Sequence, residues 1–382
     1  PDAKSLLLLA HLDVVPADPE NWQRDPICGG IDGPYVWGRG AIDCKNMVAA
    51  EMMAAIFLKR QGFTPKGDVV LAFTADEEAG GEMGVGFLAK NHWDKIKTDY
   101  TINEGGGFLI PIGSDPGDYV VQVGEKGVFW TKLRVKGTGG HGSMPIKKKE
   151  NAMYKIAQIT QKIIEYKPPI EITPTMEETI SQISLPGIAK RLLSSKRLVR
   201  PLVKMGEFLT KLPLQSVILP LVMDILNPTG LKGSDKVNNV PQYTELTLDC
   251  RLLPGHDRET LKDYLRDAMG DKLFRDVEII PIEPTQPATI NSMDNPFWKM
   301  VAEIMGGMHE GAKLVPMLSA GSTDSKFIRE RGSYALGFCP FRMDPNMPYS
   351  EMIEMAHGKN ERLWIPNFLY SIEFFTRLLK KI

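Results

Sequence analysis

Short apolar runs alternate with helix-forming segments over the first hundred residues. Residues 6–10 form a continuous apolar run, the pattern of a strand that is buried on both faces. A helix is predicted over 47–60, where no glycine or proline occurs, and further strands over 68–75 and 100–103. This alternation predicts an α/β fold in which a mostly parallel central sheet is flanked by helices.

Polar side chains follow each of these three predicted strands. His11 and Asp13 come directly after the first strand, Glu77 and Glu78 after the second, and Glu104 after the third. The carboxyl ends of parallel strands meet at one edge of a sheet, where ligands bind. We therefore expect these five residues to lie close together.

Asp43 occupies the junction between a glycine-containing loop and the predicted helix. Gly38 and Gly40 precede it in the run GRGAIDCKN and give the backbone unusual freedom. The pattern predicts that Asp43 is held at the start of the helix, where it is able to join the polar residues at the strand ends.

The pattern changes near residue 119. Alternating strands are predicted over 128–136 and 243–253, with an amphipathic helix over 150–166. These segments predict an inserted α+β domain over 126–255, between two parts of the first domain at 1–125 and 256–382. A helix over 258–274, a strand over 277–282 and a final helix over 360–380 are assigned to the second of those parts.

The segment 168–238 is an insertion within that second domain. It contains eight prolines and a basic cluster opposed by the single acid Glu207. One interpretation is a segment that contacts a membrane surface or gates the substrate; the interpretation that we favour is a set of short helices packed on the second domain. The sequence leaves the role of the insertion open.

Composition excludes several classes of function. A net charge of -1 over 382 residues gives no reason to expect nucleic acid as a partner. The four cysteines lack CxxC spacing, so we expect buried, reduced thiols.

No apolar run reaches the roughly 18 residues of a membrane span, and no signal peptide is visible. We expect a cytoplasmic protein whose N-terminus is truncated, because the chain enters a strand pattern almost at once.

The candidate side chains suit a pair of metal ions. Imidazole and carboxylate ligands favour zinc, with cobalt or manganese as substitutes, and one carboxylate can bridge two ions. In such a site the ions polarise a carbonyl and supply hydroxide, while a neighbouring carboxylate moves the proton. The proposed ligands are His11, Asp43, Glu78, Glu104 and His357.

Five motifs in order carry a resemblance to a known family. The runs LLLLAHLDVVP, WGRGAIDCKN, FTADEEAGG, INEGGG and MAHGKNERL resemble the M20 family of dinuclear zinc metallopeptidases and N-acyl-amino-acid deacylases. The resemblance implies a catalytic domain with an inserted lid and dimerisation domain. It also implies that Asp43 bridges two zinc ions, with His11 and Glu104 on one, and Glu78 and His357 on the other.

The remaining roles also come from the resemblance. Glu77 corresponds to the general base, and Asp13 to the residue that orients His11. In the run GTGGHGSMP, His141 corresponds to a lid histidine that reaches the active site of a partner subunit. Asn238 and Arg251 correspond to the pair that binds the substrate carboxylate. Ser322 lies in a loop that resembles one beside the second metal.

These observations predict a zinc-dependent hydrolase of amide or peptide bonds next to a free carboxylate. Carboxypeptidase or dipeptidase activity is favoured because the insertion is longer than in the compact deacylases. An N-acyl-amino-acid deacylase is the alternative, and a non-catalytic metal-binding or scaffold protein is the remote one. The expected substrate is a small peptide or an N-acyl amino acid, and a homodimer through the lid domain is expected. A nucleotide-binding loop is excluded because GEMGVG has the wrong spacing.

Overall fold

The computed structural model describes residues 3–110, 117–210 and 214–382. The chain divides into two compact units, which we treat separately. Unit 1 comprises Pro1–Gly124, Pro174–Ser194 and Ile290–Ile382, and unit 2 comprises Glu125–Thr173 and Ser195–Thr289.

Unit 1 is built on a seven-stranded sheet with the order β14-β6-β16-β5-β1-β4, in which β15 also pairs with β6. The strands of this sheet are β1 (Leu6–His11), β4 (Val69–Thr74), β5 (Tyr100–Asn103), β6 (Asp118–Glu125), β14 (Thr289–Ile290), β15 (Lys313–Ser319) and β16 (Tyr334–Gly337). A small second sheet consists of β2 (Ile31–Asp32), β3 (Tyr35–Trp37) and β17 (Arg362–Trp364). Its helices are α1 (Lys45–Arg60), α2 (Val85–Asn91), α3 (Trp93–Ile96), α5 (Pro174–Gln182), α6 (Gly187–Leu193), α11 (Pro296–Met308), α12 (Ser325–Glu330), α13 (Tyr349–Met355) and α14 (Ile365–Leu379).

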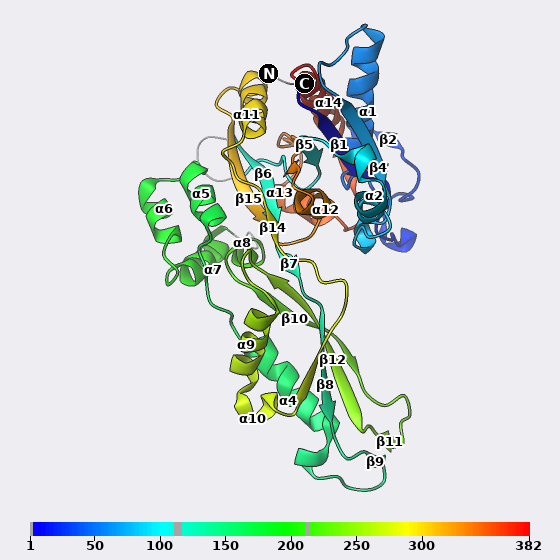
Figure 1. Ribbon diagram of the computed structural model, residues 1–382, viewed down its shortest axis with the longest axis vertical. Helices are drawn as coiled ribbons and strands as arrows, with labels where there is room; N and C mark the ends of the chain where they lie inside the picture. The colour runs from blue at the N-terminus through cyan, green and yellow to red at the C-terminus, as the bar shows by residue number, and fades with distance from the viewer. Residues whose placement is uncertain (1–2, 111–116, 211–213) are drawn as a thin grey trace. The chain divides into compact units, whose positions relative to one another are not determined.

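Strand β1 lies between β4 and β5 and is parallel to both. Successive side chains of a strand point to opposite faces of the sheet. Leu6 and Leu8 accordingly pack in one core with α1 and α14, while Leu7 and Leu9 pack in another with α2 and α12. Figure 1 shows α1 and α14 beside β1. Helices on both faces explain why the whole strand is apolar, and the predicted parallel α/β sheet is confirmed.

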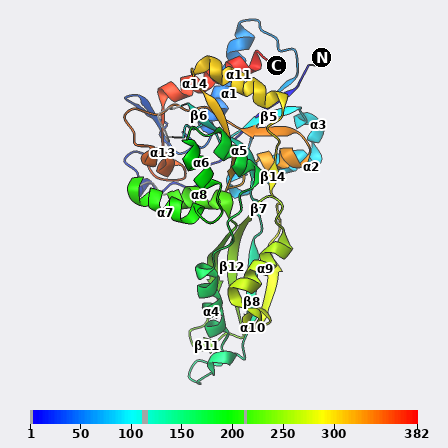
Figure 2. The ribbon, with the colours of Figure 1, turned by 90° about the vertical axis from the view of Figure 1, so that its left-hand side faces the viewer.

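Unit 2 is an antiparallel sheet of order β10-β12-β8-β13, with β7 pairing to β12, covered by helices. Its strands are β7 (Gly127–Val128), β8 (Thr131–Lys136), β9 (Gly140–His141), β10 (Ile225–Lys232), β11 (Asn239–Val240), β12 (Tyr243–Leu252) and β13 (Val277–Pro281), and its helices are α4 (Ala152–Glu165), α7 (Val199–Thr210), α8 (Leu214–Val222), α9 (Arg258–Met269) and α10 (Asp271–Phe274). Helices α4 and α9 contact each other, and α4 packs on β8 and β12 (Figure 2). The buried positions of α4 include Ile156, Ile159 and Ile163, as its periodicity predicts.

The second domain extends further along the chain than the sequence indicated. Helix α9 and strand β13, which we had assigned to the first domain beginning at 256, belong to unit 2. Strand β13 pairs with β8, and Leu261 and Leu265 of α9 lie in the core of unit 2. The predicted helix over 258–274 is divided at Gly270, whose φ of 78° is unfavourable for other residues.

The insertion over 168–238 does not pack as one block on the second domain. Helices α5 and α6 belong to unit 1, where the hydroxyl of Thr179 donates to the carbonyl of Pro316 in β15 at 2.5 Å. The end of the insertion forms strand β10, which we had not predicted. Its register with β12 shifts between Pro228 and Gly230, and this irregularity breaks the alternating pattern that identifies a strand.

Three smaller predictions have mixed outcomes. Cys44, Cys250 and Cys339 are buried free thiols as expected, but Cys28 is exposed. The final helix begins at Ile365 because Arg362–Trp364 instead forms strand β17, paired with β3. Among the described helices, none combines the length and apolar character that crossing a bilayer requires.

Replacing Leu8 by Ala is expected to lower the free energy of unfolding by about 2–5 kcal/mol, because this fully buried side chain leaves a cavity. Leu369→Ala on α14, where the side chain is 59% exposed, is the matched control and should change stability by about 0.5 kcal/mol or less. Urea denaturation followed by circular dichroism measures both. Equal effects of the two substitutions would contradict the central position of β1.

Candidate metal centre

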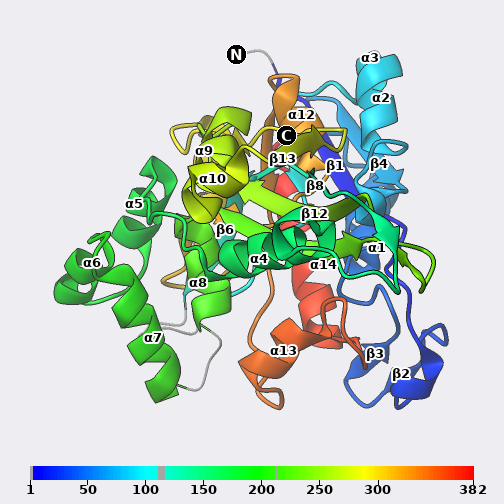
Figure 3. The ribbon, with the colours of Figure 1, turned by 90° about the horizontal axis from the view of Figure 1, so that it is seen from below.

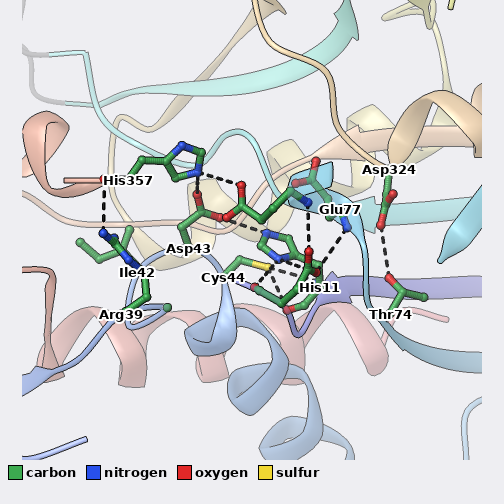
Figure 4. A network of polar contacts seen from close by, with 12 residues as sticks. His11, Arg39, Ile42, Asp43, Cys44, Thr74, Glu77, Asp324 and His357 are labelled. Atoms are coloured by element: carbon green, nitrogen blue, oxygen red, sulfur yellow. Dashed lines mark hydrogen bonds and ion pairs between the residues drawn. The ribbon is translucent and has the colours of Figure 1, made fainter. Parts of the chain in front are cut away.

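His11 is the last residue of β1 and points into a cluster of carboxylates (Figure 4). Its side chain is 2% exposed, and its Nε2 atom lies 3.1 Å from Oδ1 of Asp43. The Nδ1 atom lies 3.0 Å from the main-chain oxygen of Asp13 and 3.5 Å from a carboxylate oxygen of the same residue. The two ring nitrogens are therefore directed toward Asp43 and Asp13.

Asp43 lies between two histidines. While its Oδ1 atom faces His11, its Oδ2 atom lies 2.9 Å from Nε2 of His357. The same Nε2 atom lies 3.1 Å from Oε2 of Glu78. The two oxygens of one carboxylate thus lie close to two different imidazoles, which is the arrangement expected of a ligand that bridges two ions.

The loop that carries Asp43 is fixed by Glu361, whose carboxylate is completely buried. One oxygen accepts hydrogen bonds from the backbone N–H groups of Ile42 and Asp43, at 2.6 and 3.1 Å. The other accepts from the N–H of Gly40 at 3.0 Å and from the guanidinium of Arg39 at 2.7 Å. Arg39 in turn donates to the main-chain oxygens of residues 357 and 358, so one ion pair joins both sides of the cluster.

Glu77 and Glu78 begin the short turn that follows β4. Their backbone N–H groups donate to the carboxylate of Asp13 at 3.3 and 3.1 Å. Asp13 therefore contacts this turn through its side chain, in addition to contacting His11. Three strand ends are brought to one edge of the sheet because β4 and β5 run parallel to β1.

The electrostatics of the cluster favour added positive charge. Burial and the neighbouring carboxylate of Asp324 raise the pKa of Glu77 to about 8, and burial raises the pKa of Glu78 and Glu104 as well. Burial opposes protonation of His11, but its contacts with Asp43 and Cys44 outweigh this and raise its pKa to about 12. Several carboxylates are thus held together at a cost that a bound cation relieves.

The donor atoms fit divalent ions. Among the described residues, three sets have ligand atoms within 4.8 Å of one another, and they are His11 with Glu77 and Glu104, Asp43 with Glu78 and His357, and His11 with Asp43 and Cys44. The Oε1 atom of Glu78 is buried and has no hydrogen-bond partner among the described residues, so it has capacity for a ligand bond. Cys44 is a poor ligand because burial raises the pKa of its thiol to about 12. Nitrogen and oxygen donors of this kind suit zinc.

Three residues near the cluster have no role predicted from the sequence, although Asp324 belongs to the loop of Ser322 that resembles one beside the second metal. Glu361 lies in the run MAHGKNERL and Arg39 in WGRG, but a contact across 322 positions leaves no local pattern. Asp324 is 1% exposed, accepts from the hydroxyl of Thr74 at 3.2 Å, and has a second oxygen without a partner in the described protein. Burial raises the pKa of Asp324 to about 7. An acidic residue directly before helix α12 was the available signal.

The predicted substrate-binding residues are distributed over both units. Ser322 lies in unit 1, where its hydroxyl accepts from the ammonium of Lys326 at 3.0 Å. In unit 2, His141 and Asn238 are neighbours, because β9 pairs with β11 and the N–H of Gly142 donates to the main-chain oxygen of Asn238 at 2.8 Å. Arg251 is near the other end of β12, and its guanidinium contacts both oxygens of Asp249. The eight residue steps from Tyr243 to Arg251 span about 27 Å of strand, so the structure does not bring Arg251 to Asn238 within one chain.

Replacing Glu361 by Gln is expected to weaken divalent metal binding about 10- to 100-fold, because the loop at Asp43 loses a charged acceptor. The matched control is Glu351→Gln, which removes a partly exposed partner of Arg362 and should leave metal affinity nearly unchanged. Competition with a chromophoric zinc chelator measures both affinities. Parental affinity in the Glu361 variant would show that the ion pair does not support the cluster.

Comparison with known proteins supplies the family. The model of peptidase family M20/M25/M40 matches residues 7–381. A probable carboxypeptidase S-like protein of Dictyostelium discoideum is 27% identical over 391 residues, covering 99% of this chain and 71% of the relative. Aminoacylase-1 of Sus scrofa is 24% identical over 387 residues, covering 100% and 81% of the two chains.

A solved structure agrees at the level of the fold. The crystal structure of an M20 family metallo-carboxypeptidase from Sulfolobus solfataricus superposes with a TM-score of 0.68 at 23% identity, covering 99% of this chain and 84% of that one. The match to the family model extends over almost the whole chain and includes both units. The chain therefore belongs to peptidase family M20/M25/M40, whose members among its relatives include carboxypeptidases and aminoacylases, and is a hydrolase of C–N amide bonds.

Proposed function

We propose that the protein is a dizinc hydrolase that cleaves amide or peptide bonds next to a free carboxylate, with carboxypeptidase or dipeptidase specificity. The observation that carries the proposal is the position of Asp43, whose two carboxylate oxygens lie 3.1 Å from His11 and 2.9 Å from His357. A single carboxylate between two imidazoles is suited to bridge two ions.

Each ion would have its own pair of further ligands. His11 and Glu104 would hold one ion, and Glu78 and His357 the other, with Asp43 shared. The closeness of Glu104 to His11, and of Glu78 and His357 to Asp43, supports this division. Cobalt or manganese are expected to substitute for zinc, because the proposed ligands are all nitrogen and oxygen donors.

When bound, the two ions would supply Lewis acidity to the scissile carbonyl and lower the pKa of a water molecule. Glu77 would accept the proton of the attacking water at its carboxylate and then deliver it to the leaving nitrogen. Asp13 would hold both His11 and Glu77 in place. Its main-chain oxygen lies 3.0 Å from the ring of His11, and its carboxylate accepts a hydrogen bond from the backbone N–H of Glu77.

The substrate contacts follow from the family resemblance. Arg251 would bind the substrate carboxylate by a charge-assisted pair, Asn238 would assist, and His141 would stabilise the developing oxyanion. The separation of Arg251 from Asn238 along β12 supports a homodimer in which the lid of one subunit contributes His141 and Asn238 to the other. Ser322 is proposed to lie beside the substrate, and a cytoplasmic location stays a prediction from the sequence.

The alternative is an N-acyl-amino-acid deacylase, and the likeness to aminoacylase-1 favours it. Both activities would use the same residues, so the substrate series must decide between them. The remote alternative, a non-catalytic metal-binding protein, would be indicated by loss of Glu77 or of a ligand, and each of these residues is present.

Replacing Glu77 by Gln should lower kcat about 10²- to 10⁴-fold while the bound zinc is retained, because only the proton acceptor is lost. Glu82→Gln, an exposed neighbour, is the matched control and should keep full activity. Turnover is measured on dipeptides and on N-acetyl amino acids, with zinc and with cobalt.

Undiminished turnover in the Glu77 variant would remove its assignment as general base. Faster hydrolysis of dipeptides than of N-acetyl amino acids by the parent would support the peptidase, and the reverse order would support the deacylase. Hydrolysis of neither series by the metal-loaded parent would contradict the proposed reaction.

A further inference from the structure

Helix α7 in unit 2 has one buried face and one exposed face. Val199 and Val203 are almost fully buried, and α7 packs against α8 (Figure 3). On the other side the exposed fractions are 54% for Met205, 74% for Phe208 and 70% for Leu209. Large apolar side chains gathered in this way indicate a surface that contacts another apolar phase.

Basic side chains accompany these apolar ones. We define the α7 surface as the exposed residues Lys196, Arg197, Leu198, Lys204, Met205, Phe208 and Leu209. Lys204 and Phe208 are four residues apart and lie on the same side of the helix, while Lys196 and Arg197 lie in the turn directly before it. The surface therefore combines cationic groups with an apolar end.

No acidic side chain is exposed along 195–209, the segment that carries the α7 surface. Glu207 is the single acid over 195–210, but it is partly buried and accepts the N–H of Gln215 at 2.7 Å, at the start of α8. Arg200 is turned the other way and donates to the main-chain oxygen of Pro168 at 2.5 Å. The exposed charges of this surface are all positive, although the whole chain has a net charge of -1.

We propose that the α7 surface docks on an anionic lipid surface. A helix with cationic groups and exposed Phe and Leu side chains is suited to lie at a lipid–water interface, with its apolar side chains among the acyl chains. Anionic headgroups attract Lys and Arg that approach them closely. A second copy of the chain is a poorer partner, because a two-fold contact would place the cations of one copy against those of the other.

This proposal does not depend on the reaction at the metal centre, so its test requires no catalysis. The full chain is sedimented with phosphatidylcholine vesicles that contain phosphatidylglycerol, and with vesicles of phosphatidylcholine alone. We expect binding to the anionic vesicles that weakens as salt is added. The variant K196E/R197E/K204E should bind about tenfold more weakly or worse, and M205S/L209S should also lose binding.

Matched controls come from elsewhere in unit 2. The variants K147E/K232E/K236E and L231S/V237S alter exposed side chains outside the α7 surface and should bind like the parent. Circular dichroism verifies that each variant is folded. Equal binding to both kinds of vesicle, no binding to either, or equal losses in the control variants would overturn the proposal. Self-association that M205S/L209S abolishes would assign the surface to a second copy and would also overturn it.

Discussion

The structure of the candidate centre depends on how a single carboxylate, that of Asp43, is held between two histidines. A buried charge is stable only when its partners are held in place. Here the buried ion pair of Arg39 and Glu361 holds the backbone around Asp43. Glu361 accepts hydrogen bonds from the backbone on the Asp43 side, and Arg39 donates to the backbone on the His357 side. One ion pair thereby joins the loop that carries Asp43 to the backbone at His357.

The central sheet provides the second constraint. Because β1 is apolar on both faces and parallel to its neighbours, the residues that follow β1, β4 and β5 arrive at the same edge. The carboxylates gathered there are buried and repel one another, which raises the pKa of Glu77 and Glu104. The same repulsion that makes the cluster costly in the protein alone makes it a strong site for divalent cations.

Local patterns predicted β1, β4 and β5 and the polar residues at their ends, since an apolar run followed by a polar pair such as His11 and Asp13 is visible in the sequence. The partner of Asp43 was not predictable in this way, because Glu361 lies 318 positions away. Helix α9 was assigned to the wrong unit because amphipathic periodicity indicates that a helix is covered on one face without identifying the sheet that covers it. The roles of the gathered residues stay predictions.

The central claim is that Asp43 bridges two ions, and anomalous diffraction from zinc-loaded crystals tests it most directly. The account predicts two zinc peaks per chain, each at a ligand distance of roughly 2.0–2.2 Å from Asp43. One peak should also contact His11 and Glu104, and the other Glu78 and His357. A single peak, or two peaks of which one lies away from Asp43, would contradict the account.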